Sequence, residues 1–285
     1  MTRSKATAIG FTAILMWSLL ALMTIASAPV PPFLLNALTF AIGGMIGLVW
    51  TSRRGFALLG SVDPRAYLFG TLGLFGYHAL YFTAFRLAPS AETGLIAYLW
   101  PLFIVLLSGL LPGERLRIPH IIGALVAFAG AALIVLGREG GAGNALGYGL
   151  AFACALTWAG YSVGSRRFGT VPTEAVTIYC LATALLSAIA HLTFEETHWP
   201  VGLAGWAAVI GLGLGPVGAA FFTWDMGMKK GDIQFLGVAS YAAPLLSTLA
   251  LVAAGVAPAT LSLVAAPLLI TLGAAIAARA SRGQA

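Results

Sequence analysis

Charge is what this sequence has least of. Only 8% of its 285 residues are Asp, Glu, Lys or Arg, whereas a water-soluble domain carries about a quarter. The chain is instead 60% hydrophobic, with a mean hydropathy of +0.95, which leaves no stretch for a separate aqueous or ATP-binding domain. The apolar residues form continuous runs and do not alternate with polar ones, which excludes an outer-membrane barrel. The sequence therefore predicts an all-α polytopic membrane protein.

Acidic residues are missing from the middle of the apolar runs. All nine lie in predicted loops or at run ends: Asp63, Glu92, Glu114, Glu139, Glu174, Glu195, Glu196, Asp225 and Asp232. No carboxylate is therefore expected within the membrane to relay protons or to hold sodium in the usual way. The chain also has no metal-ligand cluster, nucleophile elbow or phosphate-binding loop. We accordingly predict no cofactor and no enzymatic activity.

Cysteine is scarce, and its two positions indicate no chemistry. Cys154 and Cys180 both lie inside apolar runs. We expect them to be packing residues, and they say nothing about the redox compartment.

The N-terminus resembles a secretory signal. Arg3 and Lys5 precede an apolar run that ends in Ala26-Ser27-Ala28, which has the form of a cleavage site. The run is longer, at about 20 residues, than the apolar core of a signal peptide, and it has a counterpart later in the chain. We therefore expect it to be retained as a membrane helix.

Apolar runs of about 20 residues, the length that crosses a bilayer, are abundant. We predict ten of them, joined by short connections that often carry Pro or Gly. Their ranges are 7–26, 32–51, 66–87, 92–111, 119–137, 145–164, 173–193, 203–224, 234–254 and 260–279. The longest candidate linker, 138–144, divides one integrated transmembrane domain into two predicted five-helix halves, 1–137 and 145–285.

Basic residues are sorted between alternate connections. With the N-terminus placed in the cytoplasm, 13 of the 15 Lys and Arg residues fall in inside segments, and only Arg86 and Arg138 fall outside. The positive-inside rule therefore predicts that both termini are cytoplasmic. Membrane topology explains the net charge of +6, and no nucleic-acid partner is expected.

The two halves share an internal repeat. The Tyr-x-x-Pro-Leu segment at 98–102 recurs at 241–245, and three further matches follow the same order at offsets of 140 to 143 residues. Because each half has five predicted helices, an odd number, the second half must be inverted relative to the first. Inverted repeats with broken helices near the membrane centre are typical of secondary transporters.

Pro101 and Pro244 occupy equivalent places near the middle of two runs. Each lacks an N–H and frees the carbonyl four residues earlier, at Ala97 and Ser240. Two interpretations are open: a packing kink, or a hinge whose freed carbonyls face a cavity and bind the ammonium group of a ligand. The glycine-rich run 211–216 is also open to two interpretations, close helix packing and unwinding beside a substrate.

Aromatic side chains with polar tips lie unusually deep. Such residues normally gather at membrane interfaces, yet Tyr77, His78 and Trp100 lie near the middle of their runs. A hydroxyl or imidazole in hydrocarbon needs a hydrogen-bond partner or water, so this face is expected to line a cavity. The predicted pocket also includes Trp17, Tyr81, Tyr98, Trp158, Tyr161 and Tyr241. Core packing of each ring, and a structural hydrogen bond for His78, are the competing interpretations.

The stretch 77–103, with Tyr77-His78 and the segment Tyr98-Leu99-Trp100-Pro101, resembles the drug/metabolite transporter superfamily in its EamA-type branch. Within that branch it looks like the bacterial exporters of aromatic amino acids. The resemblance implies ten helices around a central cavity formed by helices 1, 3, 4, 6, 8 and 9. It adds Phe222, in the eighth run, to the predicted substrate-binding residues.

The resemblance implies a secondary transporter that exports aromatic and other neutral amino acids across a bacterial inner membrane by alternating access. Its expected partners are the small-molecule substrate and the lipid bilayer, and it is expected to be a monomer. Organic cations, drugs or other small metabolites are alternative cargo. A membrane-embedded enzyme would need a His, Asp or Glu cluster at a membrane face, and phosphorylated cargo would need Lys or Arg in the cavity. The sequence shows neither.

Overall fold

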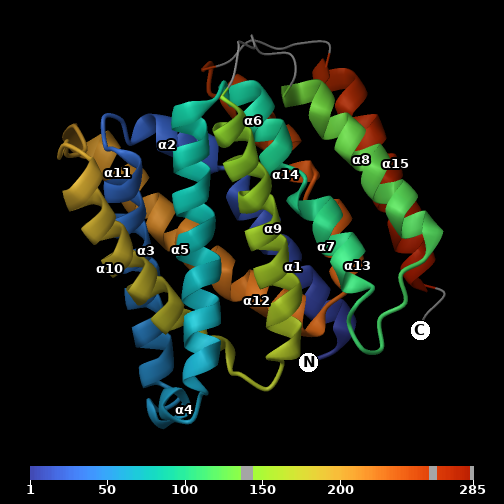
Figure 1. Ribbon diagram of the computed structural model, residues 1–285, viewed down its shortest axis with the longest axis horizontal. Helices are drawn as coiled ribbons and strands as arrows, with labels where there is room; N and C mark the ends of the chain where they lie inside the picture. Colours follow the sequence, from blue (N-terminus) through green and yellow to red (C-terminus); the bar gives the residue numbers. More distant parts are fainter. Residues whose placement is uncertain (136–143, 257–261, 283–285) are drawn as a thin grey trace.

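The computed structural model describes residues 1–135, 144–256 and 262–282, and all regular secondary structure in these ranges is helical. The helices are α1 (Arg3–Trp17), α2 (Leu20–Ala26), α3 (Pro32–Ser52), α4 (Ala57–Gly60), α5 (Pro64–Leu87), α6 (Ser90–Ala97), α7 (Trp100–Ser108), α8 (Ile118–Val135), α9 (Ala145–Arg167), η1 (Thr173–Ala175), α10 (Val176–Phe194), α11 (Gly202–Leu214), η2 (Gly215–Ala219), α12 (Ala220–Lys230), α13 (Ile233–Ala239), α14 (Ala242–Ala253) and α15 (Ser262–Arg282). Most run between the two ends of one bundle (Figure 1).

Seven helical segments within the described ranges are long and apolar enough to cross a membrane. Four of them are single helices or nearly so, and the others join two or three shorter elements end to end, as α11, η2 and α12 do over Gly202–Lys230. Three shorter apolar helices cover Glu92–Ser108, Ile118–Leu133 and Ala265–Ala280. The predicted all-α polytopic membrane protein is confirmed. The count of ten spans, their orientation and the inversion of the halves stay predictions.

Three of the long segments and the shorter α6–α7 segment are interrupted. α6 ends at Ala97 and α7 begins at Trp100, while α13 ends at Ala239 and α14 begins at Ala242. In both cases a proline, Pro101 or Pro244, lies in the first turn of the second helix, where a missing N–H costs no intrahelical bond. The segment of α1 and α2 is interrupted at Ser18–Leu19, between the two helices. In the third long segment, η2 is a π-helical turn between α11 and α12.

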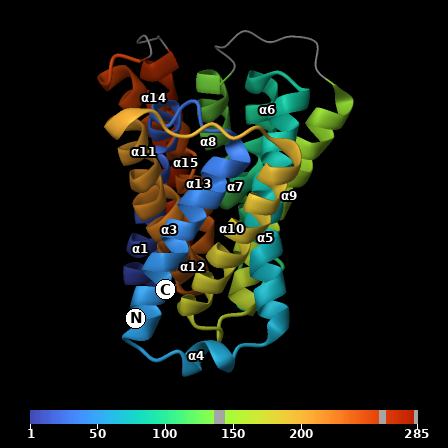
Figure 2. The same cartoon turned by 90° about the vertical axis from the view of Figure 1, so that its left-hand side faces the viewer.

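The two ends of the bundle differ. The N-terminus and the last turns of α15 lie toward the end that carries α4, as Figure 2 shows from the side. α8 and α15 pack against each other at the side of the bundle (Figure 1). The predicted linker 138–144 lies outside the described residues except for Asn144, whose side chain caps α9 by accepting from the Leu146 N–H at 2.9 Å. The division into halves therefore stays a prediction.

Glycine lets the central helices touch through their backbones. A Cβ added at Gly10 of α1 would lie 2.8 Å from the Cα of Gly227 in α12, and one at Gly43 of α3 would lie 2.9 Å from the Cα of Gly218. Distances this short admit no side chain, so α12 is held against α1 and the turn η2 against α3. Both interpretations of the run 211–216 have support, because Gly213 packs on Ile42 and the helix then opens into η2.

Candidate functional site

Four tryptophans from four helices meet in the interior. Trp17 lies 5.7 Å from Trp158, 5.0 Å from Trp224 and 6.3 Å from Trp100, measured between ring centroids. Trp100 and Trp158 are also 6.3 Å apart. These edge-on and tilted contacts are the arrangements that aromatic rings prefer. We call Trp17, Trp100, Trp158 and Trp224 the tryptophan cluster.

A second set of rings extends the tryptophan cluster along α5. Tyr77 lies 5.1 Å from Trp158 and 5.9 Å from Tyr81, and Tyr81 lies 4.3 Å from Phe85. His78 lies 5.1 Å from the ring of Phe40. Because α5 runs away from α4 (Figure 1), this path of rings leads from the tryptophan cluster toward the opposite end of the bundle.

Accessibility differs across these rings. Trp100, Trp158 and Trp224 are buried, with exposed fractions of 6%, 3% and 1%. By contrast Trp17 is half-buried, and so are the side chains with polar tips that surround the cluster, Tyr77, His78, Tyr81 and Tyr98. Tyr77 and His78 contact rings on other helices and therefore point into the bundle. Inward-facing side chains that are still partly accessible are what a cavity wall requires.

Two polar contacts fix the orientation of these rings. The indole Nε1 of Trp17 donates to the carbonyl of Pro216 at 2.9 Å, in the turn η2 where the helix is widened. The Nδ1 of His78 lies 2.7 Å from the carbonyl of Leu74, one turn earlier in α5. A carbonyl can only accept, so His78 carries a proton on Nδ1, and in the neutral imidazole Nε2 is free to accept. The structural hydrogen bond considered for His78 is therefore present, and it leaves one ring nitrogen for a ligand.

Seven of the predicted pocket residues are brought together in this way: Trp17, Tyr77, His78, Tyr81, Trp100, Trp158 and Tyr161, whose ring lies 5.3 Å from that of Trp158. Tyr98 lies at the break between α6 and α7 and is half-buried. Sequence reasoning missed Trp224 and Phe221, which contact Trp17 at 5.0 and 6.2 Å. Trp224 lies at the end of its predicted run, where an interfacial position is the ordinary expectation.

Phe222 is not brought into the tryptophan cluster. Its ring lies 5.6 Å from that of Trp50, and a Cβ at Gly47 would come within 2.8 Å of it, so Phe222 packs between α12 and α3. Neighbouring residues on a helix point about 100° apart because the helix has 3.6 residues per turn. Phe221 takes the inward direction, and Phe222 is thereby turned toward α3.

Tyr241 also lies apart from the tryptophan cluster and has a different task. It is fully buried beside Phe128, and its hydroxyl accepts from the backbone N–H of Leu102 at 3.1 Å. Leu102 is in the first turn of α7, where N–H groups have no intrahelical acceptor. Tyr241 lies at the break between α13 and α14, and it supplies the acceptor for a backbone N–H at the start of α7, which follows the break between α6 and α7.

The carbonyl of Ser240 is engaged as well. It accepts from the N–H of Ala243 at 3.0 Å, which uses one of its two lone pairs, so the interpretation that it binds a ligand ammonium group stays a prediction. The corresponding interpretation for Ala97 stays a prediction.

We expect Tyr241→Phe to lower the stability of the protein, because it leaves the Leu102 N–H unsatisfied in the interior. The loss should be about 1–3 kcal/mol, the cost of an unpaired buried donor, and a lower thermal unfolding temperature in detergent would report it. Tyr148→Phe, at a half-buried tyrosine in the first turn of α9, is the matched control. Equal unfolding temperatures for Tyr241→Phe and the control would show that the bond is not important for stability.

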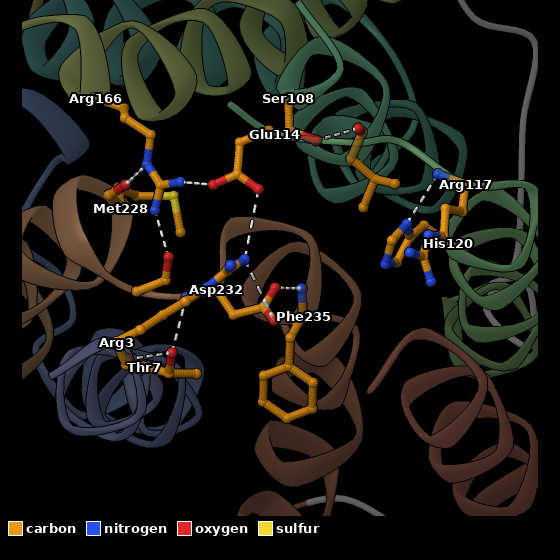
Figure 3. Close-up of polar contacts among 12 residues, drawn as sticks. Arg3, Thr7, Ser108, Glu114, Arg117, His120, Arg166, Met228, Asp232 and Phe235 are labelled. Atoms are coloured by element: carbon orange, nitrogen blue, oxygen red, sulfur yellow. Dashed lines mark hydrogen bonds and ion pairs between the residues drawn. The ribbon is translucent and has the colours of Figure 1, made fainter. Parts of the chain in front are cut away.

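At the end of the bundle near the N-terminus, ion pairs join several helix ends, as Figure 3 shows in close-up. Arg166 pairs with Glu114, and its other nitrogens donate to the carbonyls of Met228, at 2.8 Å, and of Gly231. Arg3 lies 3.4 Å from Glu114 and 3.7 Å from Asp232. We call Arg3, Glu114, Arg166 and Asp232 the N-terminal ion cluster. It joins α1, α9 and the connections α7–α8 and α12–α13.

A buried acid lies inside a helix, contrary to prediction. α12 continues to Lys230, so Asp225 is within it, with an exposed fraction of 2%. Its Oδ2 lies 2.9 Å from the Nζ of Lys229, one turn later, and accepts from the hydroxyl of Thr173 at 2.7 Å. The apolar run reaches past Asp225 because Lys229, at i+4, neutralises the charge. The expectation that all nine acids lie in loops or at run ends is wrong at this position.

Glu174 and Glu195, whose side chains are 4% and 2% exposed, stabilise connections between helices. Glu195 accepts from the N–H groups of Phe33 and Leu34 at the start of α3, and Arg86 donates to it at 2.6 Å. Glu174 pairs with Arg54 at 3.1 Å. An acid at a helix N-terminus is a stabilising arrangement. In the part of the chain that the structure describes, no three His, Cys, Asp or Glu side chains are grouped to hold a metal ion.

Comparison with known proteins gives a family that fits this geometry. The family model for EamA-like transporters matches residues 4–136 and 145–279. The chain is 56% identical to the aromatic amino acid exporter YddG of Ancylobacter novellus, over 99% of this chain and the full length of that protein. It is 27% identical to the protein of the same name from Escherichia coli, over 87% of this chain and 88% of that one.

A more distant relative and a solved structure complete the comparison. The chain is 28% identical to the pseudopaline exporter CntI of Pseudomonas aeruginosa, over 68% of each protein. A crystal structure with 55% sequence identity superposes with a TM-score of 0.94 and covers 99% of both chains. The solved structure and the relative from Ancylobacter novellus therefore share the whole bundle with this chain, and not one half of it.

Proposed function

The chain belongs to the EamA-like transporter family, and on that premise we propose that it exports aromatic amino acids by alternating access, with other neutral amino acids as further cargo. It is a multi-pass membrane transporter and not an enzyme. The observation that carries the proposal is the tryptophan cluster, in which buried rings are bordered by half-buried side chains with polar tips. The name of the 56% identical relative supports the same class of cargo.

An aromatic amino acid has the chemistry that such a site would hold. Its ring would contact the edges and faces of Trp17, Trp100 and Trp158, which already meet at 5.7 to 6.3 Å. Its amino and carboxylate groups would find the hydroxyls of Tyr77 and Tyr98 and the accepting nitrogen of His78. As whole residues Tyr77, His78 and Tyr98 are half-buried, and on this proposal a ligand reaches them before the site closes.

Organic cations are the alternative cargo. The faces of tryptophan rings attract cations, and the four rings of the tryptophan cluster would suit an apolar amine as well as a phenyl group. The two classes differ at the carboxylate, which an amino acid has and a simple amine lacks. A transport panel that includes both therefore separates the two functions.

The orientation of the site follows from the two ends of the bundle. We place the N-terminus in the cytoplasm of a bacterium, across its inner membrane, because basic residues predominate on that side. The N-terminal ion cluster then closes the cytoplasmic side, and the path Tyr77–Tyr81–Phe85 leads outward. On this proposal the structure is the outward-open state of the transport cycle.

We expect Trp100→Ala and Tyr77→Ala to weaken export of phenylalanine and tryptophan. Contact between aromatic rings is worth roughly 0.5–1.5 kcal/mol beyond area burial, so the apparent affinity should fall by up to about tenfold for each ring. The measurement is counterflow in proteoliposomes with a panel of all amino acids and one organic cation.

Trp206→Ala is the matched control, because Trp206 is 41% exposed and stacks on Trp199 at 6.2 Å on the outside of α11. It should leave the affinity unchanged. Unchanged affinity in the two cluster variants would contradict the proposed pocket. Exchange of the cation without exchange of any amino acid would favour the alternative function.

A further inference from the structure

A narrow pocket lies beside the tryptophan cluster, on the side of the N-terminal end. Its lining includes Phe69, Tyr161, Ser165, Tyr179, Asp225 and Lys229. Asp225 and Tyr161 are buried, with exposed fractions of 2% and 3%. Within the described part of the chain, the Oδ1 of Asp225 and the hydroxyl of Tyr161 have no hydrogen-bond partner. Two unpartnered polar atoms at one pocket are costly unless they bind something.

The two oxygens of Asp225 are used unequally. Oδ2 forms an ion pair with the Lys229 ammonium, at 2.9 Å, and accepts a hydrogen bond from the Thr173 hydroxyl, at 2.7 Å. Lys229 also donates to the carbonyl of Val171 at 3.0 Å. Oδ1 therefore remains as an open acceptor in the interior, and the pair ties α12 to the segment 171–173 that precedes α10.

Other titratable groups surround the pair on the neighbouring elements. Tyr161 comes from α9 and Tyr179 from α10, and both interact electrostatically with Asp225. Glu174 in η1 is also near, and it is paired with Arg54 of α3. Tyr67 of α5 lies behind Tyr179, with its hydroxyl donating to the carbonyl of Leu59 at 2.7 Å. Among these groups Asp225 is the acid with an unpartnered oxygen.

We propose that Oδ1 of Asp225 is a proton-binding site that couples export to the proton gradient, an inference that rests on the proposed function. The proton adds to Oδ1, in the pocket that Tyr161, whose hydroxyl is also unpartnered among the described residues, lines as well. The carboxyl is then neutral, so the ion pair with Lys229 is lost and the hydroxyl of Thr173 no longer donates to a charged acceptor. A metal cation does not suit the site, because the Lys229 ammonium already lies 2.9 Å from the other oxygen and would repel it.

The site is joined to the tryptophan cluster by two contacts. The ring of Tyr161 lies 5.3 Å from that of Trp158. Trp224 precedes Asp225 in α12, and its Nε1 donates to the hydroxyl of Ser162 at 3.0 Å. A change in the position of α12 therefore alters the cluster directly. Binding at the two sites is coupled to the same degree in both directions.

The direction of coupling follows from the bonds that protonation weakens. The charged carboxylate holds α12 to the segment 171–173 and so favours the state observed here. Protonation releases this contact and favours opening of the N-terminal end, where the proton leaves and cargo enters. Proton and amino acid thus move in opposite directions, and cargo binding to the observed state should release a proton.

The test uses full-length protein in proteoliposomes that contain a pH-sensitive dye. A phenylalanine gradient should drive a proton flux in the opposite direction. Asp225→Asn alone would leave Lys229 buried without a partner, so the informative variant is Asp225→Asn/Lys229→Met, which removes both charges. It should abolish the proton flux. Glu174→Gln, at a buried acid whose partner Arg54 is exposed, is the matched control and should keep the flux.

Equilibrium binding gives a second measurement. The affinity of the unmodified protein for phenylalanine should weaken by up to about tenfold per pH unit as the solution is acidified, as expected when one proton competes with one ligand. The double variant should lose this dependence. A proton flux that persists in the double variant, or cargo exchange without proton flux in the unmodified protein, would overturn the proposal and leave the export function standing.

A measurement without cargo separates this inference from the proposed function. Infrared difference spectra between acidic and alkaline solution should contain a protonated-carboxyl band that the double variant lacks and Glu174→Gln retains. That result, combined with no amino acid exchange, would mean that the export proposal fails while the proton site stands. A spectrum that is identical in the double variant would overturn the proton site.

Discussion

Replacing Arg166 by methionine should cost about 3–5 kcal/mol of folding stability, the usual penalty for removing one partner of a buried ion pair. The Arg166 side chain is 17% exposed and that of Glu114 is 8% exposed. Without the guanidinium, Glu114 keeps only the longer contact to Arg3 at 3.4 Å, and the carbonyls of Met228 and Gly231 lose a donor.

The same change should open the N-terminal end of the bundle. Ser165 is buried one residue before Arg166, so a cysteine placed there, with Cys154 and Cys180 replaced by alanine, is shielded in the intact protein. Arg166→Met should make this cysteine reactive toward an impermeant maleimide added on the N-terminal side. Glu114→Gln combined with Arg166→Met should recover part of the stability, because it removes the charge left unpaired.

Arg167→Met is the matched control for both measurements. Arg167 is exposed on the last turn of α9, and its loss should change neither the unfolding temperature nor the labelling. If Arg166→Met labels no faster than the control, the N-terminal ion cluster does not close this end of the bundle.

Much of the fold could be predicted from composition, because a segment that crosses a bilayer must be apolar and must satisfy its own backbone hydrogen bonds. Runs of about 20 apolar residues can satisfy their backbone in lipid only as helices, and the described residues contain seven such helical segments and three shorter ones. The breaks before Pro101 and Pro244 could be anticipated from the missing N–H. The break between α1 and α2 has no proline or glycine at Ser18–Leu19, so local sequence contains no signal for it.

The deep aromatic residues could be predicted for a related reason. A ring with a polar tip near the middle of an apolar run is unexpected in lipid, and Trp17, Tyr77, His78, Trp100 and Trp158 do contact one another in the interior. Family resemblance implied which helices surround the predicted cavity, but it did not imply which way each residue faces.

The structure differs from the expectations where a residue's position depends on the rotation of its helix about its axis, or on a partner residue that cannot be recognised from the sequence. Phe221 and Phe222 are adjacent and chemically identical, so only the packing of α12 on α3 decides which one faces inward. Tyr241 matched Tyr98 in the repeat, yet it bonds to Leu102 on another helix. Asp225 was assigned to a run end because its neutralising partner, Lys229, lies one turn further on.

We expect the transporter to bend at the two helix breaks that are followed by a proline in the first turn of the next helix. α6 and α7 meet at Tyr98–Leu99, and α13 and α14 meet at Ser240–Tyr241. Pro101→Ala restores an N–H that can bond to the carbonyl of Ala97 and so favours one continuous helix. We expect the exchange rate to fall by about tenfold, since in one continuous helix Pro101 would be an interior proline that costs roughly 3 kcal/mol, and half of the relief from that cost, added to the barrier, is a tenfold effect.

Equilibrium binding should change much less than the rate, because the substitution acts on the transition between states and leaves the rings of the tryptophan cluster in place. Pro244→Ala should slow exchange in the same way, and the predicted inversion of the halves gives it the opposite bias between outward-open and inward-open states. Pro112→Ala, in the exposed connection after α7, is the matched control. Cysteine accessibility on both sides of the membrane, measured with the exchange rate and the phenylalanine affinity, decides the question. If both proline variants reduce binding and rate equally, or if neither alters which side is labelled, the prolines are packing kinks and the transporter bends elsewhere.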